Sequence, residues 1–437
     1  MIKAMKTTIK TFCGLLAMLA FTACSSNTDE AVNTPQFWHV TLTASMGDAD
    51  TRALSEGANN TINASFAEND EVVVVDADGS TIVGTLKAQS AGASTTLSGT
   101  LDASTLTDGE VVTVRYRSAT ANYDGQVGTL DGIATNQDYA EGTLTVKTAS
   151  ALEFTSTHVS LAAKQSITKF SFKNASTNAE ISVKTFGIAA VGLVQSIASN
   201  GGQTVGAVTG ALTTPSSDVY VALRNNSGEK QTYSFYVKDN ADNWYTGTKK
   251  ANLANGKNYT ASVTLTKLEG LTNTSDVGTV GVVGGLPAIV VEINSVKKAV
   301  ALMNVGALCP EAYGTYYTFT ALPSLSNGWY VPTKEELDAL ATITNKSWTT
   351  QNDVWGYLFT IVTGKTLFLP AAGYDDYDNS PKDFVDVSTD GYYWSSTPVE
   401  NATTSYALNF DSGVCQTIGW YKEDALSVRP FHALPTQ

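Results

Sequence analysis

Histidine and cysteine are the side chains that most often carry catalysis or bind metal ions, and this chain of 437 residues has few of either. The three histidines, His39, His158 and His432, lie in separate segments, and none is close to a cysteine or to a second histidine. This spacing indicates neither a nucleophilic triad nor a zinc site. No phosphate-binding Gly-Lys loop and no dinucleotide fingerprint is present. We therefore predict that the protein is not an enzyme, that its histidines are structural and that it has no cofactor.

An acid-rich run over residues 373–391 offers hard oxygen ligands of the kind that bind calcium. Its carboxylates belong to Asp375, Asp376, Asp378, Asp383, Asp386 and Asp390. Their spacing matches no EF-hand loop. We expect a solvated acidic loop in preference to a calcium site, and we predict no metal.

A polar segment over residues 398–427 carries two adjacent aromatic residues, Trp420 and Tyr421. Aromatic platforms with hydrogen-bonding neighbours suit both glycans and protein surfaces. The candidate ligand-binding residues are Trp420, Tyr421, Glu400, Asn401 and Thr403. The alternative is an ordinary surface loop with a half-buried Trp420, and the sequence leaves both interpretations open.

The N-terminus has the layout of a secretory signal peptide. Residues 1–11 carry three lysines, residues 12–23 form an apolar stretch, and small residues lead directly into Cys24. The apolar stretch is shorter than the ~20 residues that a membrane-spanning helix needs. The segment Phe21 to Cys24 resembles a bacterial lipobox, which implies that residues 1–23 are removed and that Cys24 is lipidated. The alternative is an ordinary signal with a coincidental cysteine.

The chain after the leader is acidic and begins with a tether. Residues 24–36 are polar and aperiodic, so we expect them to be flexible. Asp29 and Glu30 resemble the surface-export signal of Bacteroidetes lipoproteins, which implies an outer membrane lipoprotein at the cell surface. The formal net charge is −14 for the whole chain and −17 without the leader's three lysines (24 basic against 41 acidic residues), which repels phosphate backbones and anionic headgroups. We therefore exclude nucleic acid as a partner and expect membrane contact through the lipid anchor only.

Only Cys309 and Cys415 remain for the folded part, which is too few for a disulfide framework. Either one bridge closes the last domain or both thiols stay unpaired. The sequence does not decide between these two alternatives.

Period-2 alternation of apolar residues predicts a mainly β protein. The first such run begins at Phe37 and places Trp38, Val40 and Leu42 on one face. Similar runs follow at short spacing as far as residue 268, and no long amphipathic helix interrupts them. We predict two tandem β sandwiches over residues 37–149 and 150–268.

The composition changes after residue 268. Residues 269–287 are rich in Gly, Thr and Val, and we expect a linker there. Residues 288–437 hold five of the seven tryptophans, which indicates a third domain with a different kind of core.

The stretch from Trp38 to about Lys267 resembles the fimbrillin family of Bacteroidetes pilus subunits. The resemblance rests on the order of several segments: the Thr51-Arg52-Ala53 loop, ENDEVVVVDADG, GQVGTLDGIATNQDYAEG and ITKFSFKN. It implies two β sandwiches, other pilus subunits as partners, and cleavage by an arginine protease that removes the first strand.

Cleavage after Arg52 would release the strand that bears Trp38, Val40 and Leu42. An apolar donor-strand groove with unpaired backbone groups would then favour strand addition from a neighbouring subunit. The alternative for Arg52 is a solvated loop residue.

Residues 288–437 resemble the Fibrobacter succinogenes major paralogous domain, a module with a C-type-lectin-like fold. The matching segments are VEINSVKKAVALMNVGA, NGWYVPTKEELDAL, LPAAGY, GYYWSST, YALNF and SVRPF. The resemblance implies an α+β domain. That fold is shared with formylglycine-generating enzymes, but the paired cysteines that such chemistry needs are absent.

The residues of this region also predict local structure. Thr333 and Glu336 form a capping box before a short helix, and Asn327-Gly328 suits a tight turn. The residues that we expect in the core are Trp394, Tyr406, Leu408, Phe410, Val428 and Phe431.

The preferred hypothesis is a fimbrial subunit or adhesin in a tip or accessory position, which presents its last domain as a binding face. The alternative is a surface lipoprotein that never polymerises and captures a host or bacterial glycan or protein. A hydrolase is the least favoured.

Overall fold

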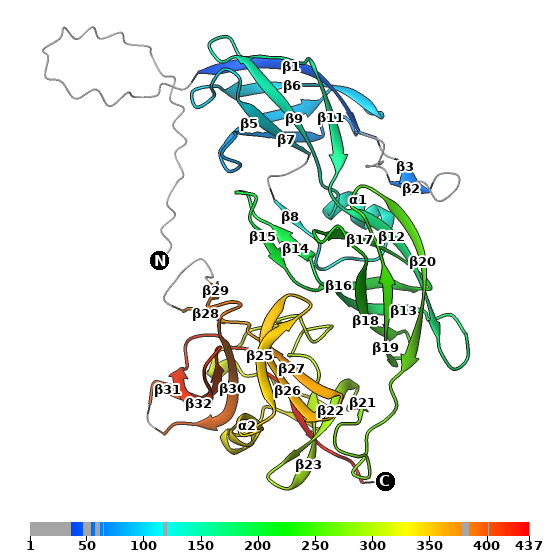
Figure 1. The fold of residues 1–437 in the computed structure, drawn as a ribbon, viewed down its shortest axis with the longest axis vertical. Coiled ribbons are helices and arrows are strands. Elements are labelled where there is room, and N and C mark those ends of the chain that lie inside the picture. The colour runs from blue at the N-terminus through cyan, green and yellow to red at the C-terminus, as the bar shows by residue number, and fades with distance from the viewer. Residues whose placement is uncertain are drawn as a thin grey trace, which may run out of the picture. The chain divides into compact units, whose positions relative to one another are not determined.

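The computed structural model describes residues 36–46, 54–56, 62–63, 65–116, 120–377, 384–400 and 402–436. The protein is mainly β, as predicted, and its two α-helices in this described part are short (Figure 1). No helix among these residues has the length and apolar character needed to cross a membrane.

The first β region is an eight-stranded sheet in the order β10-β9-β11-β1-β6-β5-β4-β7, and β9 also pairs with β7. The additional pairing closes the sheet on itself, which removes most free strand edges. Its strands are β1 (Phe37–Met46), β4 (Glu71–Val75), β5 (Ile82–Ala88), β6 (Ser94–Asp102), β7 (Val111–Tyr116), β9 (Ala140–Thr148), β10 (Glu153–Phe154) and β11 (His158–Ala163). Two short strands, β2 (Ser55–Glu56) and β3 (Ile62–Asn63), form a separate pair.

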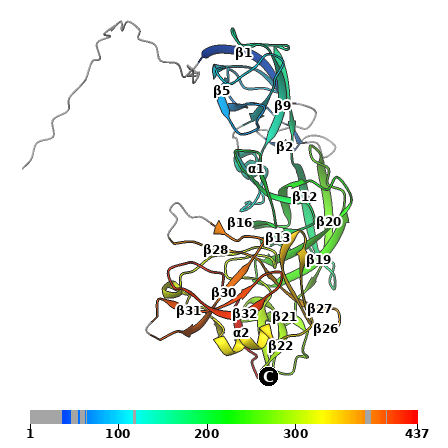
Figure 2. The same cartoon turned by 60° about the vertical axis from the view of Figure 1, so that its left-hand side comes forward.

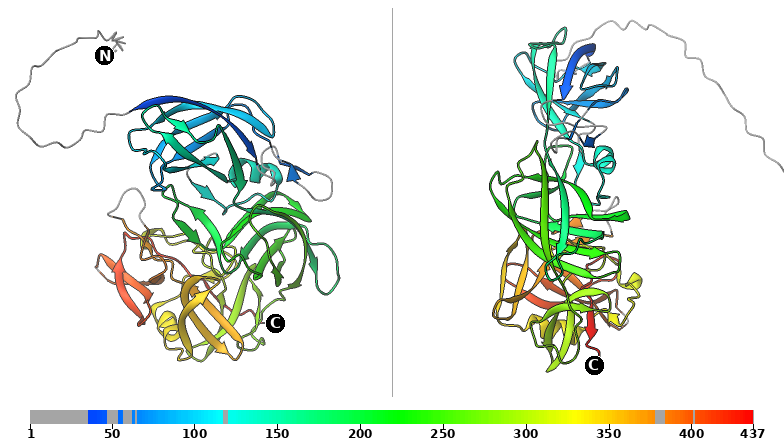
Figure 3. Two further views of the ribbon diagram at one scale, coloured as in Figure 1. Left: turned by 45° about the horizontal axis from the view of Figure 1, so that its top comes forward. Right: turned by 90° about the vertical axis from the view of Figure 1, so that its right-hand side faces the viewer.

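Strand β1, dark blue in Figure 3, has a neighbouring strand on each side and therefore does not lie at an edge of this sheet. It pairs antiparallel with β6 along its length and parallel with the start of β11. Val40, Leu42 and Ala44 alternate into the hydrophobic core, as predicted for the first two. Trp38 shares their parity but is 37% exposed, because it lies near the start of β1 opposite the end of β6. Trp38 is therefore not part of this core, and its place in a donor-strand groove stays a prediction.

The second β region is a ten-stranded sheet whose main path is β15-β14-β17-β12-β20-β19-β18-β13-β16, with β8 paired to β14. Its first long strand, β12, runs parallel to its last, β20. The elements are β8 (Ala121–Asn122), α1 (Leu130–Asn136), β12 (Ser166–Asn174), β13 (Val183–Ala189), β14 (Leu193–Ile197), β15 (Gln203–Val205), β16 (Val208–Ser216), β17 (Asp218–Asn225), β18 (Gln231–Asp239), β19 (Trp244–Ala251) and β20 (Asn258–Lys267).

The two β regions exchange segments, so the predicted boundary at residue 149 is wrong. Strands β10 and β11 belong to the first sheet. Conversely, Tyr123, Ile133 and Tyr139 lie in the core of the second region although strands of the first region flank them in the chain. The buried Gln126 fixes this excursion, because its amide donates to Ala222 O at 2.7 Å and accepts from Ala222 N at 2.9 Å. Such pairings are non-local, so no local alternation pattern predicts them.

A polar cluster around Glu141 lies where the chain passes between the two β regions. Its carboxylate accepts a hydrogen bond of 2.7 Å from the Tyr139 hydroxyl and forms ion pairs with Arg115 at 3.3 Å and Lys164 at 3.0 Å. Arg115 also donates to Ser199 O at 3.1 Å, which joins the first region to the second. Burial opposes ionisation of Glu141, but these hydrogen bonds and charges outweigh it and lower its pKa.

The C-terminal region, residues 268–436, combines small sheets with one α-helix. Its elements are β21 (Val280–Val283), β22 (Leu286–Ile293), β23 (Val296–Ala301), the 3₁₀ helix η2 (Phe319–Ala321), β24 (Trp329–Tyr330), α2 (Lys334–Ala341), β25 (Lys346–Gln351), β26 (Val354–Val362), β27 (Lys365–Pro370), β28 (Tyr374–Asp375), β29 (Phe384–Val385), β30 (Gly391–Pro398), β31 (Thr404–Phe410), β32 (Cys415–Tyr421) and β33 (Phe431–Ala433). Helix α2 packs against β31 and β32 (Figure 2). The C-type-lectin-like fold stays a prediction.

Local predictions for this region are confirmed. Thr333 and Glu336 form the capping box of α2, and Asn327 and Gly328 both have positive φ, as a tight turn requires. The predicted core residues Trp394, Leu408, Phe410, Val428 and Phe431 are buried. Tyr406 is only half-buried.

The predicted linker over residues 269–287 is instead part of the folded C-terminal region. Strand β21 and the start of β22 form a hairpin there, and Leu271 is buried. Gly284 and Gly285 make its two-residue turn, with φ of 52° and 81°. The glycine-rich composition therefore marks a tight turn and not a flexible connection.

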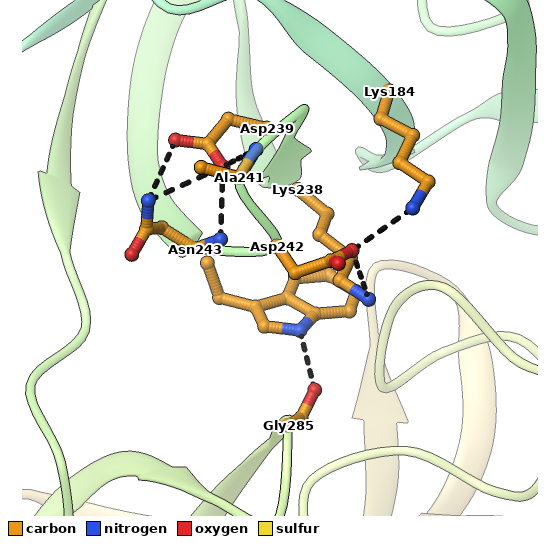
Figure 4. A network of polar contacts seen from close by, with 8 residues as sticks. Lys184, Lys238, Asp239, Ala241, Asp242, Asn243 and Gly285 are labelled. Atoms are coloured by element: carbon orange, nitrogen blue, oxygen red, sulfur yellow. Dashed lines mark hydrogen bonds and ion pairs between the residues drawn. The ribbon is translucent and has the colours of Figure 1, made fainter.

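The indole of Trp244 joins the second β region to the C-terminal region; its hydrogen-bond acceptor, Gly285, and the turn of Asp239 that precedes it are labelled in Figure 4. Its ring is buried in the same core as Ile289 and Val291 of β22, and Nε1 donates to Gly285 O at 3.0 Å. The preceding turn is held by Asp239, whose Oδ1 accepts from the backbone nitrogens of Ala241 and Asn243, each at 2.8 Å. The second β region thus contributes its own side chain to the core of the C-terminal region.

We predict that Trp244→Ala destabilises the C-terminal region by about 3–5 kcal/mol, because it leaves a cavity in a shared core and an unpaired Gly285 carbonyl. Calorimetric unfolding checks this expectation. Trp355→Ala is the control, since Trp355 is 41% exposed. Equal unfolding temperatures for Trp244→Ala and wild type would contradict the role of this contact.

We predict that Glu141→Gln destabilises the protein by about 1–3 kcal/mol near neutral pH. The folded pKa of Glu141 lies below its ordinary value of 4.5, so its stabilisation is present above that value and is lost as the pH falls through the folded pKa. Urea unfolding across this range should show the two proteins converging at low pH. Glu153→Gln, which breaks an exposed ion pair with Lys147, should have little effect at any pH. A difference that is constant with pH would contradict the prediction.

Candidate ligand-binding site

A cavity of about 540 Å³ opens on the C-terminal region. Four of the residues that line it are aromatic, three are acidic and one is a threonine. They are Tyr374, Asp376, Tyr377, Thr403, Trp420, Tyr421, Glu423 and Asp424. Its volume is within the range of small-molecule sites.

One wall of the cavity is the end of β32 and the segment that follows it. Pairing of β31 with β32 sets Thr404 opposite Tyr421 and Ser405 opposite Trp420. Beyond the strand, Lys422 N donates to Thr403 O at 2.9 Å. These backbone bonds bring Thr403 beside the two aromatic residues, about twenty positions away in the chain.

The opposite wall is residues 374–377, which backbone hydrogen bonds hold against the first wall. Asp375 and Ala425 bond reciprocally, with N to O distances of 2.9 and 3.0 Å. Tyr377 N also donates to Asp424 Oδ1 at 3.2 Å. The two walls therefore have a fixed separation.

Packed aromatic rings support the floor. The Trp420 ring lies 5.1 Å from Tyr374 and 4.4 Å from Tyr392, measured between centroids. Tyr392 is buried and donates to Asp386 Oδ2 at 3.2 Å. These contacts hold Trp420 half-buried, while Tyr377 and Tyr421 are 65% and 63% exposed.

The cavity is electronegative. Asp376, Glu423 and Asp424 contribute carboxylates, and none of its eight described lining residues is basic. Burial, together with the negative charges of Asp376, Asp386 and Asp424, raises the pKa of Tyr374. A cationic or hydrogen-bond-donating ligand is therefore favoured over an anion.

The structure brings together three of the five predicted ligand-binding residues, namely Trp420, Tyr421 and Thr403. Glu400 is exposed but does not line the cavity, and Asn401 lies outside the described residues. Glu423 and Asp424, which directly follow the aromatic pair, also line the cavity but are not among the predicted residues. Tyr374 and Tyr377 are not among them either, although two tyrosines within an acidic run were an available signal.

The acidic run does not form a single solvated loop. Asp376 lines the cavity, and Asp386 accepts a hydrogen bond from the Tyr392 hydroxyl. The pKa of Asp390 is raised, mainly by burial. Asp378 and Asp383 lie outside the described residues. Within the described ranges, no group of three or more His, Cys, Asp or Glu side chains is arranged to hold a metal ion.

Cys309 and Cys415 are both free thiols, so the structure has the second of the two predicted alternatives and no bridge. Burial raises the pKa of the Cys415 thiol to about 11, and that of Cys309 is also raised. Neither thiol is therefore activated as a nucleophile.

The lipidation residue Cys24 and the processing residue Arg52 lie outside the described residues. Their roles stay predictions.

A second cavity, of about 580 Å³, lies at the junction between the second β region and the C-terminal region, and each region supplies one of its walls. Asp124, Ser196 and Thr209 supply polar groups on one side, and Tyr313 and Tyr316 supply aromatic rings on the other. The Asp124 carboxylate is bonded within the protein, because its Oδ1 accepts hydrogen bonds from Thr209 N and from Thr209 Oγ1.

A family model described as "Domain of unknown function (DUF8237)" matches residues 339–431, which include all eight residues that line the first cavity. No curated protein matches the chain.

Solved structures that resemble the chain come from adhesion and pilus proteins. A candidate cell adhesion protein from Bacteroides uniformis is 12% identical, with 52% of this chain and 96% of that chain covered and a TM-score of 0.30. A fimbrial assembly protein from Parabacteroides distasonis is 11% identical, with 61% and 95% covered and a TM-score of 0.25. A shaft pilin from Lactobacillus rhamnosus is 11% identical, with 53% and 98% covered and a TM-score of 0.24. Because these TM-scores are low, we base the function on the residues of this chain.

Proposed function

We propose that this chain is a cell-surface adhesin of fimbrial type, delivered as an outer membrane lipoprotein through Cys24. It binds a glycan or a protein on a host or bacterial surface through the aromatic cavity of the C-terminal region. The observation that carries the proposal is the convergence of Tyr374, Tyr377, Trp420 and Tyr421 on one open cavity.

Exposed aromatic side chains are costly in a protein that has no partner for them, and binding energy at interfaces concentrates in such residues. Tyr377 and Tyr421 keep most of their surface in solvent at the rim of the cavity, while packed rings fix Trp420 beneath them. A rigid aromatic floor between adaptable polar groups binds a ligand with little loss of conformational entropy. These groups suit the recognition of a ligand.

We predict that Trp420→Ala and Tyr421→Ala each weaken binding on an array of host and bacterial surface glycans and proteins by about tenfold or more. Tyr421→Ala tests the site without disturbing the packed rings, because its side chain is exposed. Trp355→Ala is the matched control, since it removes an exposed tryptophan that does not line the cavity. Unchanged binding by both cavity variants, or no binding by the wild-type protein to any member of the array, would contradict the proposal.

A second function, assembly by strand replacement, is favoured by the position of β1. This strand is the first of the described part, yet it pairs on both sides and buries Val40, Leu42 and Ala44. Its loss would leave β6 and β11 with unpaired backbone groups and would open an apolar groove between them. A strand from another pilus subunit could refill that groove.

The anchoring of Leu54 suits cleavage at Arg52. Leu54 is buried in the core of the second β region, only two residues after the proposed cleavage site. A cut after Arg52 would therefore release β1 while the new N-terminus stays attached to the protein. A subunit that accepts a strand in this way would occupy a tip or accessory position in the proposed fimbria.

We predict that protein cut by an arginine-specific protease binds a labelled peptide of residues 36–46, whereas uncut protein does not. The Leu42→Asp peptide should bind at least about tenfold more weakly, because its charge would enter the apolar groove. Arg52→Lys protein should resist the cut and bind neither peptide. Equal binding of both peptides, or retention of β1 after cleavage, would contradict strand replacement.

A further inference from the structure

We propose that the aromatic cavity of the C-terminal region recognises an ammonium group carried on a sugar ring, and that its ligand is an amino-sugar glycan. This inference rests on the proposed function of the cavity and specifies the class of ligand. No anion or hydrophobic ligand uses both kinds of group that the cavity presents.

Aromatic faces and carboxylates both attract organic cations. A cation over a Trp or Tyr ring is stabilised by the ring quadrupole, and a carboxylate adds a charge-assisted hydrogen bond. Here four aromatic rings and the carboxylates of Asp376, Glu423 and Asp424 surround one space of about 540 Å³. An ammonium group entering this space meets both kinds of partner at once.

The basic residue nearest in the chain does not neutralise the cavity. Lys422 lies between Tyr421 and Glu423, but its ammonium donates to Ala402 O at 2.8 Å and lies 5.6 Å from the centre of the Phe319 ring. It is not among the lining residues. Lys422 therefore supplies no ammonium group to the cavity.

The electrostatic field at the floor of the cavity also favours a cationic ligand. The pKa of Tyr374 is raised by burial and by Asp376, Asp386 and Asp424, so negative charge acts on the ring that packs against Trp420. The same charges would stabilise a cation placed over that ring.

The dimensions favour a sugar over a lysine side chain of a protein partner. A single alkyl-ammonium chain would leave most of a 540 Å³ space empty. Sugar rings present C–H faces that stack on Trp420 and Tyr421 and hydroxyls that Thr403 and the carboxylates can bind. Two or three amino-sugar units would use the floor, the rim and the charges together.

The test compares two short oligosaccharides with the same sugar backbone, namely a β-1,4-linked glucosamine oligomer, whose nitrogens are charged ammonium groups, and its N-acetylated form, whose nitrogens are uncharged acetamides. Titration calorimetry on the intact protein at about pH 6, where amines are protonated, should give at least about tenfold tighter binding of the glucosamine oligomer. Added salt should weaken that binding.

Two variants localise the charge effect. Glu423→Gln should reduce the affinity for the glucosamine oligomer toward that for the acetylated form and leave the latter unchanged. Glu400→Gln, which changes an exposed acid outside the cavity, is the matched control and should change neither affinity.

The outcomes separate this inference from the proposed function. Equal affinity for the two oligomers, lost in Tyr421→Ala, would overturn the cation assignment and leave the adhesin proposal intact. Binding of a lysine-rich peptide but not of the glucosamine oligomer would overturn the sugar assignment. Failure of the glucosamine oligomer to bind, with Tyr421→Ala unaltered toward every probe on the array, would overturn both.

Discussion

Burial of the Trp244 indole is the interaction on which the placement of the ligand cavity depends. A side chain of the second β region completes the core of the C-terminal region, and its N–H satisfies the carbonyl of Gly285 in the β21–β22 turn. That turn also receives the indole N–H of Trp329, which donates to Val283 O at 3.2 Å. Two tryptophans thus clamp one glycine turn. Burial of large aromatic groups stabilises such a contact. The C-terminal region, which holds the cavity, is therefore fixed to the second β region and not flexibly tethered to it.

The first and second β regions are also fixed to each other, because segments of the chain pass from one region into the other. The chain passes from β7 into the second core, returns as β9, and leaves again after β11. Glu141, Arg115 and Lys164 form a partly buried ionic cluster at this crossing. Load applied at the first region is therefore transmitted through several backbone connections and through ion pairs.

Local features were predictable from sequence, and non-local ones were not. Alternation over residues 37–46 and the Thr333–Glu336 capping box depend on neighbours a few positions apart, and both predictions are confirmed. The place of β11 beside β1, and of residues 121–139 in the second core, depends on pairings that no local pattern contains. The glycines at 284 and 285 were read as a linker because composition does not distinguish a tight turn from a flexible segment. For the cavity, Trp420 and Tyr421 were found as an adjacent pair, whereas Tyr374 joins them only through the backbone bonds of Asp375 to Ala425.

The central claim is that the cavity floored by Trp420 is the place where the protein binds its ligand. The most direct measurement is a crystal structure of the intact protein soaked with the short glucosamine oligomer. We expect sugar density stacked on Trp420 or Tyr421, with an amino group of the sugar within hydrogen-bond distance of the carboxylate of Glu423 or Asp424. An empty cavity, with the sugar instead beside Tyr313 and Thr209 or on the exposed Trp355, would contradict it.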